Sequence, residues 1–159
     1  MHPMQPLMTL LAQAERERDM ALSDAQRSAQ AHQAAIDQAE QLLVYRREYE
    51  QRWSTRFQSE GRIELVHCYR AFTDRLTQAV EQQQRIVQHT AAQMERMRVA
   101  LAEHEMRVAS VRKLIERRAQ ELRLSADRIE QKQADEFGAR MAWSTPTLSL
   151  GLGVPRAAA

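Results

Sequence analysis

The histidines and the single cysteine are the side chains of this sequence most suited to binding a metal or attacking a substrate. The histidines are His2, His32, His67, His89 and His104. No two of them lie three or four residues apart, the spacing that brings two imidazoles to one side of a helix. His67 and Cys68 are adjacent, so on a helix they point about 100° apart and do not converge.

The segment GLGV at 151–154 lacks the Lys-Ser/Thr pair of a phosphate-binding loop, and no strand pattern precedes it. Because neither a phosphate-binding loop nor a pair of suitably spaced histidines is present, we predict no catalytic residue, no cofactor and no metal site. We therefore do not expect an enzyme or a small-molecule substrate.

A basic stretch between Arg107 and Arg123 is the second candidate for chemistry. It holds six cations against Glu116 and Glu121, which gives a local charge of +4. One interpretation is nucleic-acid binding, which would weaken steeply with salt; the other is a solvated helix face with charge pairs. The stretch has no aromatic side chain to stack on bases, which favours the solvated face. We expect no nucleic-acid partner, although an acidic protein surface would fit the same charges.

The composition predicts the elements that carry these residues. Only 4 Gly and 4 Pro occur in 159 residues, which argues against sandwiches, barrels and other folds with many tight turns. Ala, Gln, Glu, Arg and Leu are all good helix formers. With 23 cations and 21 anions the net charge is +2, which is typical of a solvated surface of mixed sign. The fold class is therefore all-α with long helices.

Chain breaks divide the sequence into two helices and a tail. Pro6 suits the first turn of a helix, and Ser59-Glu60-Gly61 is the only break in the first 137 residues. We predict helices at about 6–58 and 62–140, which form an antiparallel coiled-coil hairpin over 4–140, and a flexible tail at 143–159. The sequence has no signal-peptide pattern and no apolar run of the roughly 18–20 residues that span a bilayer. We expect a cytoplasmic or peripherally membrane-bound protein.

Seven-residue repeats support the coiled coil. In the second helix, nine of the eleven residues at every seventh position from Val66 to Glu136 are apolar. Such a row drifts around a straight helix unless the helix supercoils against a partner. The companion row, from Tyr69 to Lys132, is apolar at only four of ten positions. The row in the first helix is mostly alanine until Leu42, so we expect the part of the hairpin far from the turn to be its softer part.

A turn near residue 60 places residue i roughly opposite residue 120 − i. Residues after about 117 would then have no partner in the chain, and this overhang would be a docking surface, an oligomer interface or a frayed end. Nearer the turn, four residues on each helix share one face. They are Gln38, Leu42, Tyr45 and Tyr49 on the first helix and Phe72, Leu76, Ala79 and Gln83 on the second. This set is either local core or a composite binding patch.

Three segments resemble the FliJ family of the flagellar type III export apparatus. They are the opening from Pro6-Leu7 to Ala14-Glu15, the segment Gln41-Leu42 with Tyr45, Glu48 and Tyr49, and the run Arg128-Ile129-Glu130-Gln131-Lys132 followed by Asp135-Glu136-Phe137. The resemblance covers about residues 4–140 and does not include the tail. It implies a non-enzymatic, stalk-like antiparallel coiled coil at the inner face of the membrane at the flagellar base.

The resemblance also implies partners and site residues. The export ATPase hexamer would be bound by Leu122, Arg128, Ile129, Gln131, Lys132, Asp135 and Phe137. The cytoplasmic region of the export-gate membrane protein would be bound by the eight residues of the composite face, from Gln38 to Gln83, although the family has a basic residue where this chain has Gln83. Export chaperones are further expected partners. The alternatives are the equivalent stalk of a virulence-type injectisome and an Arg-rich coiled coil that binds nucleic acid.

Overall fold

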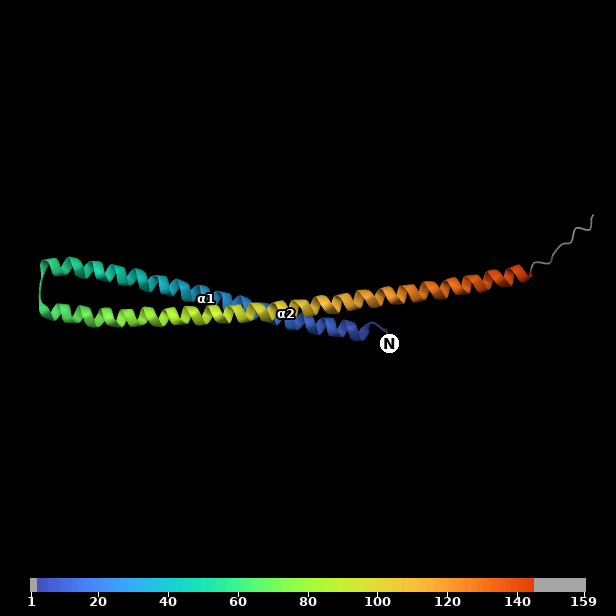
Figure 1. The fold of residues 1–159 in the computed structure, drawn as a ribbon, viewed down its shortest axis with the longest axis horizontal. Coiled ribbons are helices and arrows are strands. Elements are labelled where there is room, and N and C mark those ends of the chain that lie inside the picture. Colours follow the sequence, from blue (N-terminus) through green and yellow to red (C-terminus); the bar gives the residue numbers. More distant parts are fainter. Residues whose placement is uncertain (1–2, 145–159) are drawn as a thin grey trace, which may run out of the picture. The chain divides into compact units, whose positions relative to one another are not determined.

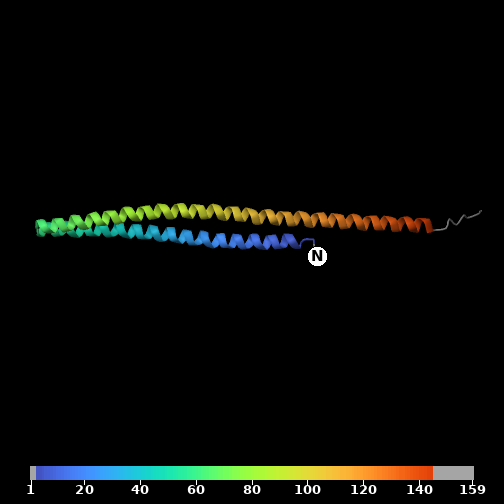
Figure 2. The ribbon, with the colours of Figure 1, turned by 90° about the horizontal axis from the view of Figure 1, so that it is seen from below.

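The computed structural model describes residues 3–144, which form two α-helices. Helix α1 is Gln5–Ser59 and helix α2 is Ile63–Ser144. Through residue 113 the two helices pack side by side and antiparallel as a hairpin, as the two views in Figure 1 and Figure 2 agree. The predicted all-α hairpin of two long helices is confirmed.

The helix ends follow local chemistry. Pro6 lies in the first turn of α1, where its missing N–H costs nothing. At the other end the backbone N–H of Glu60 donates to the carbonyl of Arg56 at 2.9 Å, which closes the last turn. Gly61 has no positive φ and open space around its Cβ position. It therefore marks the turn through its low helix propensity and not through a left-handed conformation.

Within the described residues helix α2 extends to Ser144, four residues beyond the expected end at 140. Gly138 lies inside it, because one exposed glycine costs a helix only about 1 kcal/mol and does not terminate it. Trp143 and Ser144, expected in the tail, are helical. The remainder of the expected tail, 145–159, lies outside the described residues.

Small side chains at seven-residue spacing line the seam on α1. Ala14, Ala21, Ser28 and Ala35 are its buried residues. On α2 the buried residues are Leu76, Gln83, Val108 and Val111. Three of these four belong to the companion row, so that row faces the interior despite its polar members.

Polar contacts across the seam give the register. The Gln83 side-chain amide donates to the carbonyl of Ala35 at 2.9 Å, and His32 is hydrogen-bonded to the Thr90 hydroxyl at 3.1 Å. Both pairs lie close to the expected pairing of residue i with 120 − i. The turn position read from the sequence therefore placed the helices against each other correctly.

The second unit of the structure begins at Leu114. Its described part, residues 114–144, is the C-terminal part of α2. Ile115, Ala119 and Leu122 are half-buried, and every residue from 123 to 144 is exposed. In neither unit do the described residues include a helix long and apolar enough to cross a membrane.

Candidate docking surfaces

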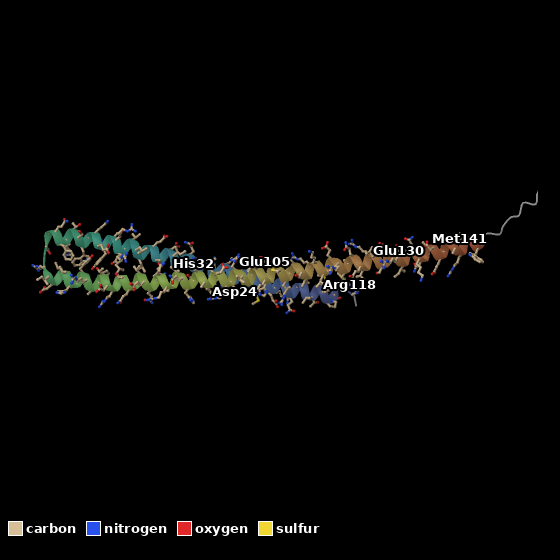
Figure 3. All side chains as sticks on the ribbon, viewed as in Figure 1. Asp24, His32, Glu105, Arg118, Glu130 and Met141 are labelled. Carbon is tan, nitrogen blue, oxygen red and sulfur yellow. The ribbon has the colours of Figure 1, made fainter. Side chains whose placement is uncertain are left out.

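Six aromatic side chains meet between the helices next to the turn, where Figure 3 shows ring side chains in the space between the two ribbons. This ring cluster consists of Tyr45, Tyr49, Trp53 and Phe57 on α1 and Tyr69 and Phe72 on α2. Tyr49 is at its centre. The Tyr49 ring centroid lies 4.3 Å from that of Phe72 and 5.9 Å from those of Trp53 and Tyr69.

The rest of the cluster extends from Tyr49 in two directions. Toward the turn, the Trp53 and Phe57 ring centroids lie 5.7 Å and 5.4 Å from that of Tyr69. Away from the turn, the Tyr45 ring lies edge-on to Phe72, with 6.4 Å between the centroids. Tyr45 is 44% exposed, whereas the other five rings are half-buried. The cluster therefore presents one of its rings to solvent on a support made of the others.

The eight residues expected on the composite face differ in burial. Gln38 and Tyr45 are exposed, Leu42, Tyr49, Phe72 and Ala79 are half-buried, and Leu76 and Gln83 are buried. The face is thus partly core and partly surface. The sequence could not distinguish local core from binding patch at these positions. A seam residue and the residue three positions after it lie on the same stripe of the helix.

Gln83 is the member whose surroundings differ most from those of a contact residue. It is 6% exposed, and its side-chain amide donates a hydrogen bond to the Ala35 carbonyl. A partner could reach this amide only by breaking its buried hydrogen bond to the Ala35 carbonyl and drawing the side chain out of the seam. Direct recognition by Gln83 is therefore unfavourable.

The Arg-rich stretch is partly paired with carboxylates. Within the hairpin, Arg112 lies 2.7 Å from Glu15 and Arg107 lies 3.1 Å from Glu17. In the second unit Arg118 pairs with Glu121 at 2.9 Å. These pairs neutralise half of the six cations in the stretch, which favours the solvated, charge-paired face over a binding site for nucleic acid.

The residues expected to contact the ATPase lie on 114–144, the segment on which Figure 3 labels Glu130. Leu122 is half-buried and the other six are exposed. At about 100° per residue, Leu122, Ile129 and Phe137 lie on one side of the helix. Gln131 and Asp135 lie on the opposite side. The set therefore surrounds the helix and does not form a stripe.

Among residues 3–144 no group of three His, Cys, Asp or Glu side chains is arranged to hold a metal ion. Cys68 is a free, exposed thiol. The described residues thus offer surfaces for docking, and the ring cluster is the best defined of them.

A family model described as "FliJ: Flagellar FliJ protein" matches residues 3–146. No curated protein and no solved structure matches the chain.

Proposed function

The chain belongs to the FliJ family, the non-enzymatic, stalk-like components of the flagellar export apparatus, and from this premise we propose that it couples the export ATPase hexamer to the export gate. Residues 122–137 would contact the ATPase ring, and the exposed part of the composite face would contact the cytoplasmic region of the gate protein. Export chaperones are further proposed partners. The proposed location is the inner face of the membrane at the flagellar base.

The observation that carries the proposal is the distribution of the ATPase set around its helix. A helix that docks on a flat surface uses one stripe, whereas a helix enclosed by a ring is contacted from all sides. Leu122 and Phe137 on one side, and Gln131 and Asp135 on the other, fit enclosure. The exposure of residues 123–144 leaves these side chains accessible to the ring.

The gate contact is supported by the way Tyr45 is held. Tyrosine is enriched among the residues that dominate binding energy at interfaces. A ring fixed against Phe72 and Tyr49 loses little further conformational entropy when it is buried by a partner. Gln38 and Ala79 would border this anchor.

Truncation tests the ATPase contact. A chain ending at Arg123 should lose binding to the ATPase hexamer, because it lacks six of the seven proposed contact residues. Its hairpin should keep the thermal melting of the full chain, since all the buried residues of the described range 3–144 lie between Ala14 and Val111. The matched control ends at Ala142 and should bind like the full chain. Normal binding by the Arg123 truncation would overturn the assignment.

Substitutions at the ring cluster test the gate contact. Tyr45→Ala and Phe72→Ala should weaken binding to the purified cytoplasmic region of the gate protein without loss of helicity. Leu43→Ala is the matched control, because Leu43 is 37% exposed and lies about 200° from Tyr45 around α1. A collapse of the circular dichroism signal in the Tyr45 variant would show that the ring serves the core instead.

A further inference from the structure

Two rows of side chains flank the seam on one face of the hairpin. Each row lies three positions after the seam residues of its helix. On α1 the row contains Gln38 and Tyr45, which follow the seam residues Ala35 and Leu42. On α2 it contains Phe72, Ala79, Ile86 and Gln93, which follow the seam residues Tyr69, Leu76, Gln83 and Thr90. We call these two rows the flank rows. They contain both exposed members of the proposed gate surface, Gln38 and Tyr45, and two of its four half-buried members, Phe72 and Ala79.

Contacts along the hairpin show that the two flank rows lie on the same face. Tyr45 meets Phe72 edge-on near the turn. Ala31 and Asp24 precede Gln38 by seven and fourteen residues and so extend the α1 row away from the turn. They line one hollow together with Gln93 of the α2 row. The face between these two points contains Ile86.

At the level of Gln83 the usual arrangement of side chains is reversed: a polar residue faces the seam and an apolar residue faces solvent. The amide Gln83 points into the seam and is buried, while the aliphatic Ile86 is 42% exposed on the flank row. Phe72, Ala79 and Ile86 are spaced by seven residues, so the supercoil keeps them on one side of α2. Ile86 thus continues the apolar part of the surface beyond Ala79.

We propose that Ile86, and not Gln83, is the last α2 contact of the gate-docking surface, and that the gate protein presents an apolar surface to it. Gln83 is a positioning residue that holds α2 against Ala35. The inference rests on the proposed gate contact and specifies the chemistry of the partner at this site. The α2 flank row supplies no cation at this level, because its side chain there is the aliphatic Ile86.

Ile86→Glu is the direct test, with the purified cytoplasmic region of the gate protein as the probe. A carboxylate facing an apolar surface should weaken binding at least tenfold, whereas Ile86→Leu should bind within twofold of the wild type. The matched control is Val99→Glu, because Val99 is a 44% exposed aliphatic residue of α2 on a different face. It should leave binding within twofold, and all three variants should keep the helicity and melting temperature of the wild type.

Gln83→Leu separates positioning from contact. This variant removes the amide but keeps the volume in the seam, so gate affinity should stay within twofold at an unchanged or higher melting temperature. A tenfold loss of affinity at unchanged melting would assign the contact to Gln83 and overturn the inference. Normal binding by Ile86→Glu would overturn it as well. Failure of the wild-type chain to bind the gate region would instead overturn the proposed gate contact itself.

Discussion

The two ends of the hairpin use the same backbone geometry with side chains of very different size. Near the turn six rings lie in the seam or beside it, and their neighbouring centroids are 4.3–6.4 Å apart. In the arm, which we define as residues 5–39 of α1 with the part of α2 that faces them, the buried α1 residues are three alanines and Ser28. Heptad spacing alone therefore does not tell how firmly two helices are held.

The energetic difference follows from area and contact. An aromatic pair contributes about 0.5–1.5 kcal/mol beyond the area it buries. A buried alanine offers one methyl group, on the order of 0.8 kcal/mol. The arm adds cross-helix ion pairs, Glu15 with Arg112 and Glu17 with Arg107, but exposed pairs contribute only about 0.2–1 kcal/mol each. We expect the hairpin to open from its N-terminal arm while the ring cluster stays closed.

The largest effect is expected at the centre of the ring cluster. Tyr49→Ala removes the ring that contacts four others, and should lower the free energy of unfolding by about 2–4 kcal/mol. Urea unfolding followed by circular dichroism measures this change. Tyr49→Phe keeps the ring and should stay close to wild type. If Tyr49→Ala lowered the free energy of unfolding less than a substitution in the arm does, the turn end would not be the more stable end of the hairpin.

A smaller effect is expected for the best-buried side chain of α2 in the arm. Val108→Ala removes two methyl-sized groups from the seam and should cost about 1–2 kcal/mol. Hydrogen exchange should show the loss of protection in residues 5–39, with the amides of Tyr49 and Trp53 unchanged. Exposed Val99→Ala is the control and should change stability by less than about 0.5 kcal/mol. Equal loss of protection at both ends would mean that the hairpin opens as one unit.

The ion pairs of the arm should contribute less again. Arg112→Gln breaks the 2.7 Å pair with Glu15 and should cost about 0.2–1 kcal/mol at low ionic strength. In 1 M salt the difference from wild type should shrink, because the screening length is then about 3 Å, close to the 2.7 Å separation of the pair. Thermal melts of both proteins at the two salt concentrations measure this. A penalty of the same size at both salt concentrations would indicate lost packing of the arginine stem.

The smallest effect concerns a pair on the outside of the arm. Arg98 donates to Glu95 at 2.7 and 2.9 Å, and this hydrogen bond lowers the pKa of the Glu95 carboxyl below its usual value. Because the folded pKa is the lower one, the small stabilisation is present above the unfolded pKa and is lost as the pH falls through the folded value. Carboxyl NMR titration of wild type and Arg98→Gln should show the pKa of Glu95 rising in the variant. An unchanged pKa would mean that the pair does not persist in solution.

The burial of individual residues shows which features of the structure could be predicted from the sequence. The heptad row from Val66 and the break at Gly61 predicted the hairpin and its register, because apolar spacing and helix propensity are local properties. The composite face was harder. Leu76 and Ala79 lie three residues apart on one stripe, and only the packed partner helix separates the buried residue from the half-buried one.

The amino-acid sequence by itself determined two long helices, the position of the turn and membership of the FliJ family. The tertiary structure decided which polar side chain was turned inward. Gln83 is buried because the Ala35 carbonyl lies within hydrogen-bond reach across a seam that a small side chain leaves open. That acceptor belongs to the other helix and is 48 residues away in sequence. The sequence around Gln83 gives no sign of this acceptor. For the same reason the sequence could not predict that the neighbouring Ile86 is exposed.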